Sequence, residues 1–430
     1  MPKNIFAIRG MKDILPNEIV YWQHIENILR KVAKNYGYQE IRLPIMESTD
    51  VFIRSIGETS DIVEKEMYTF EDKGGRSVTL RPEGTASFVR AYVQHHIYNN
   101  PAPQKFFYTG PMFRYERPQA FRFRQFYQIG VEAMGIYDPK LDAEIISMLS
   151  RLLSGIGLKG LHVQITSIGC KKCRPDYRVA LKDFLKDKLD SFCSDCQRRY
   201  DLNPLRILDC KVPGCIESRK GSPPVIDYLC DACDTHFEGV KKNLAELNVP
   251  HTVNPNLVRG LDYYTKTAFE VTSENLGSQS AVAAGGRYDS MVDEFGGPPT
   301  PGIGFAMGME RIIPLIKESA DISEGPEIFL CPLGEDAAEK ALLLTEQLRS
   351  EGLWAEMNFD STSLRSQMRK ANKIGAKKVV VIGDDELKNN KAVIRNMLDR
   401  EEVTINLNVS EFIKIIQNNN ASSPSLKKGD

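Results

Sequence analysis

The stretch that most constrains the fold is Phe113–Glu132, which reads FRYERPQAFRFRQFYQIGVE. Its residues alternate with a period of two on both sides of the turn-like segment 118–121, so we expect a hairpin of two apolar, aromatic strands. The hairpin carries four arginines, whose planar guanidinium groups suit phosphate oxygens: Arg114, Arg117, Arg122 and Arg124. The interleaved aromatic rings can stack on a base. The stretch therefore predicts a nucleotide-phosphate site, or else a solvated basic hairpin with an aromatic core face.

The same stretch resembles motif 2 of the class II aminoacyl-tRNA synthetases, in which Arg-x-Glu precedes a loop and Arg-x-Arg-x-Phe follows it. The loop residues Glu-Arg-Pro-Gln are similar to those of bacterial histidyl-tRNA synthetases. That family usually has a glycine before the second arginine cluster, where this chain has Phe121. A bulky residue adopts a positive φ only at a cost, so the sequence leaves the conformation of the loop open.

Residues 17–45 predict a helix followed by an edge strand. The helix has one apolar face, made by residues three or four apart: Ile19, Trp22, Ile25, Ile28, Leu29, Val32 and Tyr36. The strand-like segment YQEIRLPI, residues 38–45, contains Pro44, which suits an edge strand or a subunit contact. The pattern resembles motif 1 of the family, which forms its dimer interface, and equally fits an ordinary helix–strand unit.

A short predicted strand, Ser77–Leu80, leads into the sequence Arg-Pro-Glu-Gly-Thr. The glycine at the strand end allows Glu83 and Thr85 to face a pocket. From the residues alone, a helix start capped by Thr85 is the favoured interpretation. The segment resembles one in histidyl-tRNA synthetases, and the resemblance implies that Glu83 and Thr85 contact the amino group of histidine.

The segment Leu257–Glu270, LVRGLDYYTKTAFE, predicts an aromatic and threonine-rich strand after an Arg-Gly pair. A pocket for an imidazole needs an aromatic wall with hydrogen-bonding groups, which Tyr263 and Tyr264 can supply. Core packing is the alternative for these two tyrosines. The segment resembles the histidine-specific signature of the family, which implies that Arg259 neutralises charge on the reacting phosphate.

A glycine-rich run, GIGFAMGMER, leads from a predicted strand into a helix at residues 302–311. Glycines there allow the backbone to approach a nucleotide closely. Arg311 falls in the first turn of the helix, beside such a ligand. The run resembles motif 3 of the family, in which this arginine contacts the phosphates of ATP.

Eight of the nine cysteines lie within 64 residues and form four close pairs. The pairs are Cys170 with Cys173, Cys193 with Cys196, Cys210 with Cys215, and Cys230 with Cys233. Such spacing is typical of structural zinc sites, and eight thiolates suffice for two four-cysteine sites. The sequence leaves open which pairs combine, and buried, metal-free cysteines remain the alternative. Zinc pairs of this kind are not a general feature of the family.

The last part of the chain alternates strand and helix patterns over residues 326–416, which predicts a small α/β domain with a mostly parallel sheet. The pattern alone fits any small α/β module. It resembles the anticodon-binding domain of several class II synthetases. The polar residues 417–430 predict a disordered tail.

Composition excludes few classes of function. The chain has 430 residues, is 26% charged and has a net charge of −1, which suits a globular enzyme and still allows local basic patches for nucleic acid. It contains neither an apolar run of the ~18–20 residues that a membrane span needs nor a signal-peptide pattern. We therefore expect a cytoplasmic protein with no membrane contact, whose reduced cysteines favour metal over disulfides.

The resemblance covers about residues 4–416. It implies an α+β class II synthetase catalytic domain, an antiparallel sheet with helices, over 1–169 and 236–322. A cysteine-rich insert at 170–235 interrupts this domain, and the anticodon-binding domain follows at 326–416. The implied activity is histidine–tRNA ligation by a homodimer, with ATP and Mg²⁺, on a histidine-accepting tRNA. Structural Zn²⁺ is our own addition.

The resemblance also implies a role for each matching residue. Arg114, Arg259 and Arg311 carry the catalytic charge on phosphate, and Arg114, Glu116 and Arg311 bind ATP, with Glu116 at the adenosine or Mg²⁺. The histidine pocket consists of Glu83, Thr85, Gln128, Glu132, Tyr263 and Tyr264. Arg117 and Gln119 contact the acceptor end of the tRNA.

Two other functions fit the same fold. One is the regulatory subunit of a histidine-biosynthetic phosphoribosyltransferase, which does not aminoacylate. The other is a tRNA-sensing binding module, which we expect to lack the ATP arginines. The presence of Arg259, Arg311, the Glu-Arg-Pro-Gln loop and a complete C-terminal α/β domain argues against the regulatory subunit. The ATP arginines, which this chain keeps, argue against the binding module.

Overall fold

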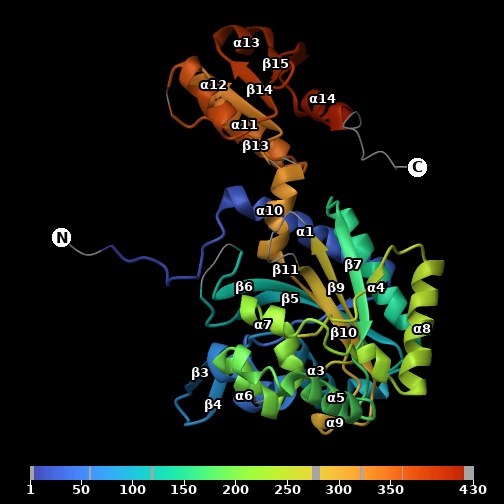
Figure 1. Ribbon diagram of the computed structural model, residues 1–430. Coiled ribbons are helices and arrows are strands. Elements are labelled where there is room, and N and C mark those ends of the chain that lie inside the picture. Colours follow the sequence, from blue (N-terminus) through green and yellow to red (C-terminus); the bar gives the residue numbers. More distant parts are fainter. Residues whose placement is uncertain are drawn as a thin grey trace. The chain divides into compact units, whose positions relative to one another are not determined.

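The computed structural model describes residues 4–57, 60–117, 121–273, 281–319, 322, 324–360 and 362–420 (Figure 1). The chain divides into a larger unit, Met1–Asp321, and a smaller one, Ile322–Asp430. No described helix has the length and apolar character needed to cross a bilayer.

The larger unit is built on an eight-stranded sheet with the order β1-β5-β6-β11-β10-β9-β7-β8. Its strands are β1 (Gln39–Glu40), β5 (Gln104–Phe113), β6 (Gln125–Met134), β7 (Leu161–Ser167), β8 (Thr252–Val253), β9 (Thr265–Ser273), β10 (Ala281–Arg287) and β11 (Gly302–Gly308). Only the two short edge strands pair in parallel, β1 with β5 and β8 with β7. The predicted antiparallel sheet is confirmed.

Strand β6 shows how the sheet divides its two faces. Successive side chains of a strand point to opposite faces. Ile129, Val131 and Ala133 point to one face and are fully buried. A layer of helices contacts the sheet: α1 (Pro16–Asn35), α4 (Pro139–Gly155), α8 (Asp231–Glu246) and α10 (Met309–Ser319). The alternate residues Gln128 and Glu132 face the other side, toward the cleft described below.

That second side is covered by shorter elements. Helices α2 (Thr49–Ile56), α3 (Thr85–Gln94) and α9 (Met291–Glu294) contact one another. Beside them lies a three-stranded sheet of order β2-β4-β3, from β2 (Met46–Ser48), β3 (Tyr68–Glu71) and β4 (Ser77–Leu80). The single strand predicted over residues 38–45 is wrong: β1 ends at Glu40, and the chain next pairs at Met46 in a different sheet. Pro44 lies between them and has no N–H to donate.

The cysteine-rich insert lies between β7 and α8. It consists of short helices and single turns: α5 (Arg174–Lys186), η3 (Leu189–Ser191), α6 (Ser194–Leu202), η4 (Pro204–Asp209), α7 (Pro213–Ser218) and η5 (Val225–Tyr228). Its small core contains Tyr177, Leu181, Phe192, Ile207 and three of the cysteines. By its contacts, the insert belongs to the larger unit.

The smaller unit has a five-stranded sheet of order β13-β12-β14-β15-β16. The elements are β12 (Ile328–Pro332), α11 (Glu335–Ser350), β13 (Ala355–Met357), α12 (Leu364–Lys373), β14 (Lys378–Ile382), α13 (Asp384–Asn389), β15 (Lys391–Asn396), β16 (Glu402–Asn406) and α14 (Val409–Asn420). Strands β13, β12 and β14 are parallel, but β15 and β16 add an antiparallel hairpin that the sequence patterns missed. Helix α14 extends to Asn420, so a tail beginning at 417 starts too early, and residues 421–430 lie outside the described part.

Candidate functional site

A cleft of about 320 Å³ opens on the second side of the large sheet. The residues predicted from sequence that line it are Glu83, Thr85, Arg114, Glu116, Gln128, Glu132, Arg259, Tyr263, Tyr264 and Arg311. They come from segments up to 228 positions apart, between Glu83 and Arg311, so the sheet brings together groups that the sequence only suggested were related.

The hairpin β5–β6 contributes the first group of charges. Arg114 directly follows β5, and its Nε donates to the carbonyl oxygen of Pro82 at 2.8 Å, which fixes the guanidinium beside the Glu83 segment. Arg122, on the returning strand side, forms an ion pair with Glu116. The guanidinium of Arg114 also lies 5.4 Å from the centre of the Phe126 ring. The two arginines therefore enter the cleft held by polar and aromatic neighbours.

Two further arginines complete the positive charge. Arg311 is in the first turn of α10, and its Nη1 donates to the carbonyl oxygen of Ala281 at 2.8 Å. Burial lowers the pKa of Arg311, and the nearby positive charges of Arg122 and Arg114 lower it further. Arg259 pairs with Glu270 on β9 at 2.8 Å. Clustered guanidinium groups repel one another, so this part of the cleft favours an anion with several oxygens.

At the inner end of the cleft lies Glu132, a carboxylate that is 1% exposed. Its Oε1 accepts hydrogen bonds from Thr85 Oγ1 at 2.8 Å and from the Tyr108 hydroxyl at 3.0 Å. Its Oε2 accepts one from the Tyr288 hydroxyl at 2.6 Å. Burial raises the pKa of Glu132 to about 8, although these three donors act in the opposite direction. The raised pKa favours the protonated, uncharged form of Glu132 at neutral pH.

Glycines make this arrangement possible. A Cβ at Gly130 would lie 2.1 Å from the Tyr108 ring, and one at Gly304 would lie 1.9 Å from Glu132 Oε2. Gly130 is paired with Tyr108 across β5–β6, and Gly304 is paired with Glu132 across β11–β6. Gly130 on β6 thus leaves room for the tyrosine, and Gly304 of the glycine-rich run leaves room for the glutamate.

Glu83 caps helix α3, and Thr85 does not. The Glu83 carboxylate accepts hydrogen bonds from the backbone N–H groups of Thr85 at 2.9 Å and of Ala86 at 2.7 Å. Thr85 is the first helical residue, and its hydroxyl is directed to Glu132. The cap interpretation of Thr85 is therefore wrong, and the hydroxyl is available as part of the pocket.

Tyr263 and Tyr264 lie immediately before β9, so the prediction that they sit in a strand is wrong. Both are buried, and their ring centroids are 4.6 Å apart. The Tyr263 hydroxyl donates to Glu83 Oε2 at 3.4 Å. Gln128 completes this region, and its Oε1 is buried without a hydrogen-bond partner among the described residues. An unpaired buried oxygen at a cleft wall marks a position where a ligand can donate.

The loop between β5 and β6 is only partly described. Gln119 lies outside the described residues, and Arg117 is exposed and does not line the cleft. Phe121 lines it and has a φ of +61°. A left-handed conformation costs a residue with a Cβ roughly 1–2 kcal/mol, so the chain keeps the backbone shape that a glycine would allow.

Sequence patterns missed several groups in this cleft: Tyr288, Glu270, Glu310, Asp209 and Lys211, together with Tyr108, which donates to Glu132 behind it. Nothing in the sequence indicated a role for Tyr108, because an aromatic residue in a buried strand usually belongs to the hydrophobic core. Tyr288 follows the glycine pair of β10, and only the fold shows that its hydroxyl reaches β6. Asp209 and Lys211 flank the ligand-type residue Cys210 in the insert.

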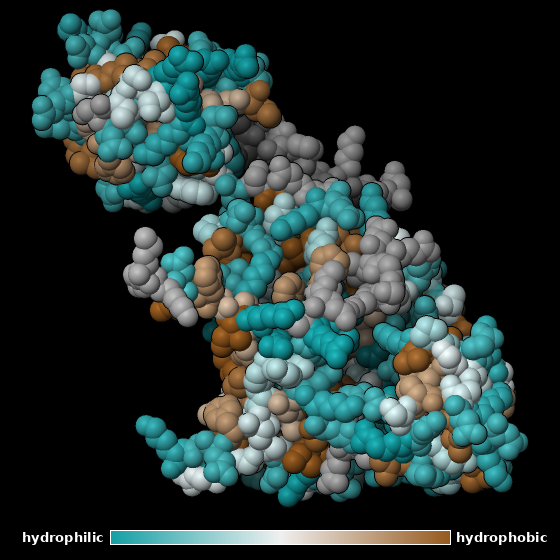
Figure 2. All heavy atoms as spheres, turned by 60° about the vertical axis from the view of Figure 1, so that its left-hand side comes forward, coloured by the Kyte–Doolittle hydropathy of each residue, from teal (hydrophilic) through white to brown (hydrophobic). Residues whose placement is uncertain are grey.

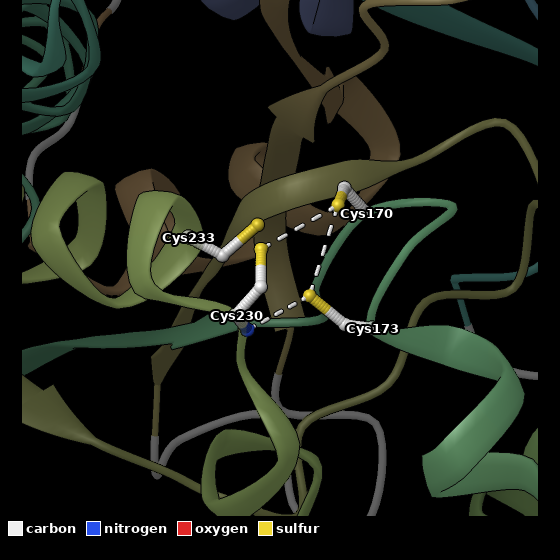
Figure 3. A group of neighbouring side chains, drawn as sticks. All are labelled: Cys170, Cys173, Cys230 and Cys233. Atoms are coloured by element: carbon white, nitrogen blue, oxygen red, sulfur yellow. Dashed lines mark hydrogen bonds between the residues drawn. The ribbon is translucent and has the colours of Figure 1, made fainter.

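The eight clustered cysteines form two separate groups. Cys170, Cys173, Cys230 and Cys233 make the first, and Cys193, Cys196, Cys210 and Cys215 the second. In each group the four sulfur atoms lie within 4.8 Å of one another. Figure 3 shows the first group, with its sulfur atoms directed toward a common centre. The first pair of the sequence thus combines with the last, and the two middle pairs combine with each other.

The sulfur positions fit a tetrahedral metal. A Zn–S distance of about 2.3 Å places neighbouring sulfurs about 3.8 Å apart. Cys170 Sγ lies 3.7 Å from Cys173 Sγ and 3.9 Å from Cys230 Sγ, and Cys193 Sγ lies 3.9 Å from Cys210 Sγ. Backbone N–H groups also point at the sulfurs, as from Cys230 to Cys173 Sγ at 3.2 Å. All nine cysteines are free of disulfides.

Comparisons with known proteins agree with this geometry. The family model described as "Histidyl-tRNA synthetase" matches residues 10–173 and 223–312, and the one described as "Anticodon binding domain" matches residues 327–419. The two stretches matched by the first model leave out residues 174–222, which make up most of the cysteine-rich insert.

This chain is similar in sequence to curated histidine–tRNA ligases. It is 51% identical over 411 residues to a histidine–tRNA ligase of Thermodesulfovibrio yellowstonii, covering 95% of this chain and 97% of the relative. It is 49% identical to that of Geobacter sulfurreducens, covering 95% and 98%. A crystal structure of apo histidyl-tRNA synthetase from S. aureus matches with a TM-score of 0.79 at 39% identity, covering 96% of this chain and 99% of that one.

The raised pKa of Glu132 predicts a pH-dependent stability. Between about pH 4.5 and 8 the folded protein holds a proton at Glu132 that the unfolded chain releases. The free energy of unfolding should therefore fall with rising pH across this window, with a contribution of up to about 1.4 kcal/mol per pH unit. The variant Glu132→Gln should lose this component, as measured by urea unfolding from about pH 5 to about pH 8. The exposed Glu246→Gln serves as the control, and parallel curves for wild type and Glu132→Gln would contradict the prediction.

Proposed function

The chain belongs to the histidyl-tRNA synthetase family, and we propose from this premise how its cleft carries out histidine–tRNA ligation. The enzyme activates histidine with ATP and transfers it to its cognate tRNA. In the first step a carboxylate oxygen of histidine attacks the α-phosphorus of ATP, and the bond to pyrophosphate breaks. In the second step a terminal ribose hydroxyl of the tRNA attacks the activated carbonyl, and AMP leaves.

The observation that carries this proposal is the convergence of Arg114, Arg259 and Arg311 on one cleft. Negative charge builds up on the α-phosphate and on the departing pyrophosphate during the first step. Guanidinium groups that are already fixed at that position stabilise the charge without reorganising. The hydrogen bonds from Arg114 to Pro82 and from Arg311 to Ala281 supply this fixation, and Glu270 holds Arg259.

The amino acid occupies the inner end of the cleft, where Glu83, Thr85, Gln128, Glu132, Tyr263 and Tyr264 meet. The α-ammonium group and the imidazole N–H of histidine are donors, and this region supplies acceptor oxygens. Binding of a cation beside Glu132 favours its ionised form. Because the neutral imidazole has one donor and one acceptor nitrogen, a pocket with acceptors and hydroxyl donors selects it over apolar side chains.

Mg²⁺ enters this cleft with the phosphates of ATP. Magnesium prefers oxygen ligands and usually keeps several waters beside one or two carboxylates. Glu116 and Glu270 line the cleft near the arginines and suit that role. When bound, the ion neutralises phosphate charge, while the protein side chains orient the two substrates.

The tRNA is the macromolecular partner, and the smaller unit matches an anticodon-binding domain. We assign Arg117 and Gln119, on the β5–β6 loop, to the acceptor end of the tRNA, because that loop borders the cleft at Phe121. The regulatory-subunit alternative is disfavoured because the chain has the ATP arginines in one cleft and a full C-terminal domain.

A homodimer is our proposal for the assembly. One face of the three-stranded sheet carries Met46 and Phe70, which are 46% and 48% exposed, and Ile45 beside them is 46% exposed. Figure 2 shows apolar residues gathered along one margin of the larger unit. The resemblance of residues 17–45 to motif 1, which implies a dimer contact there, supports this proposal at Ile45. A tRNA substrate and nine free thiols support a cytoplasmic location.

Zinc is the metal that we propose for the two cysteine groups. Their four-sulfur composition and spacing suit Zn²⁺, which takes four thiolates in closed structural sites. Such sites leave no open position for a substrate, so the metal stabilises the insert and takes no part in the reaction.

The role of Arg259 predicts a specific defect. Arg259→Ala should reduce histidine-dependent ATP–pyrophosphate exchange about 10³-fold, because a fixed charge at the reacting phosphate is lost. Affinity for tRNA should stay close to that of wild type. The exposed α4 variant Arg151→Ala is a matched control that removes an arginine away from the cleft. Exchange by Arg259→Ala at the wild-type rate would refute the role.

Metal analysis of the purified protein should find about two zinc ions per chain, one for each closed four-thiolate site. Cys331→Ser, which changes the buried cysteine of β12 outside both groups, should keep both ions. Cys230→Ser should lose one. A folded protein that contains no metal would remove the zinc proposal.

A further inference from the structure

The insert carries two charged residues into the cleft from a segment that the family model leaves unmatched. Asp209 and Lys211 line the same cleft as Arg114, Arg259 and Arg311. Both lie in the segment between residues 173 and 223 that the family model leaves unmatched. The substrate cleft of this chain is therefore completed by residues of its cysteine-rich insert.

The conformation at Cys210 explains why Lys211 faces the cleft. Cys210 is buried in the second cysteine group and has an extended backbone, with φ −64° and ψ 133°. In an extended segment, the residues on either side of a side chain point the opposite way. Because Cys210 turns toward the other three sulfurs, Lys211 turns outward, and its direction depends on the cysteine group. Asp209, the last residue of η4, reaches the same cleft.

The same segment is fixed to the catalytic loop at its other end. Arg206, in η4, contacts Asp262 Oδ1 with its Nε at 3.0 Å and its Nη2 at 2.9 Å. Asn203 donates to the same oxygen at 3.1 Å. Asp262 is three residues after Arg259, and the negative charge of Asp209 is close enough to help raise the pKa of Arg259. The segment 203–211 thus runs between the histidine-specific loop and the metal-ligand group.

A second set of contacts holds the insert in place from the other side. Arg198 makes a two-fold contact with Glu64, at 2.8 and 2.7 Å. Arg199 pairs with Asp61, and Lys65 pairs with Asp195 at 3.3 Å. These ion pairs join α6, which begins directly after Cys193 and contains Cys196, to the segment 61–65. Contacts on both sides of the second cysteine group therefore hold it against the rest of the larger unit.

Lys211 is exposed and has no carboxylate partner in the described part of the chain, unlike several other lysines of the insert. Lys182 and Lys220, by contrast, pair with Asp201 and Glu217. An unpaired ammonium at the mouth of a cleft lined by arginines adds to a site for phosphate.

We propose that Lys211 contacts a substrate phosphate in the cleft and that metal in the Cys193, Cys196, Cys210 and Cys215 group holds it there. The proposal rests on the proposed ligase function, since the phosphate belongs either to ATP or to the 3′ end of the tRNA. It makes the insert a part of the active site whose contribution depends on metal.

The first test compares Lys211→Ala, Lys211→Arg and the control Lys220→Ala. Calorimetric ATP affinity, the kcat and KM for ATP in pyrophosphate exchange, and single-turnover transfer of histidine from the adenylate to tRNA are measured. A contact to ATP predicts that Lys211→Ala weakens ATP binding and raises the KM for ATP about tenfold, with the KM for histidine unchanged. A contact to tRNA phosphate predicts normal exchange and about tenfold slower transfer. Lys211→Arg should recover most of either loss because it keeps the charge.

Wild-type values for all three measurements in Lys211→Ala would overturn the proposal. Failure of the ligase function itself is recognised in the wild-type protein, which would then show no exchange with histidine. The ATP affinities of wild type and Lys211→Ala would still test the proposed contact of Lys211.

The second test concerns the metal. Cys215→Ser should lose one zinc ion and show the same defect as Lys211→Ala, and the double variant should be no worse than either single variant. If Cys215→Ser does not fold, zinc is removed from the wild-type protein with a chelator and then restored, with the same measurements. Loss of metal with unchanged ATP affinity and transfer, or multiplied losses in the double variant, would show that Lys211 does not depend on the metal.

Discussion

The buried carboxylate of Glu132 is the constraint around which the rest of the site is arranged. An ionisable group without access to water needs hydrogen-bond donors, and three hydroxyls from α3, β5 and the segment after β10 provide them. Those donors can reach it only because Gly130 and Gly304 leave space on the neighbouring strands. The glycines of β6 and β11 are thus a packing requirement of the proposed amino-acid pocket. The same cleft therefore combines an inner end that suits a cation, at Glu132, with an outer part that suits an anion, at the arginines.

The insert follows a different physical principle. Its helices are short, and three of the cysteines belong to its small hydrophobic core. For a segment with so little apolar area, the proposed zinc–thiolate bonds would add stability that packing alone supplies less readily. Because Cys210 lies between Asp209 and Lys211, the stability of the insert and the composition of the cleft are set by the same residues. The hydrogen bond from Arg206 Nε to Asp262 extends this connection to the loop that carries Arg259.

Local patterns predicted those parts of the structure that depend on neighbours in sequence. Strand β4 has the predicted bounds, Ser77–Leu80, and α1 follows its predicted apolar face closely. The motif residues Arg114, Arg259 and Arg311 meet in one cleft, as expected. Contacts between distant segments were not predictable in this way. The hydroxyl of Tyr288 reaches Glu132 across 156 positions, and the combination of the cysteine pairs depends on how α5–α7 fold back. The start of α3 is capped by Glu83 and not by the predicted Thr85, because the Glu83 carboxylate accepts hydrogen bonds from two backbone N–H groups at once.

The most direct test of the account is the amino-acid specificity of ATP–pyrophosphate exchange by the wild-type protein. Each amino acid is supplied separately, without tRNA, so that only the activation step is measured. The pocket built on Glu132 and the arginines at its mouth predict exchange with histidine alone. Exchange with another amino acid at a comparable rate, or none with histidine in a protein that binds it, would contradict the assignment of this cleft.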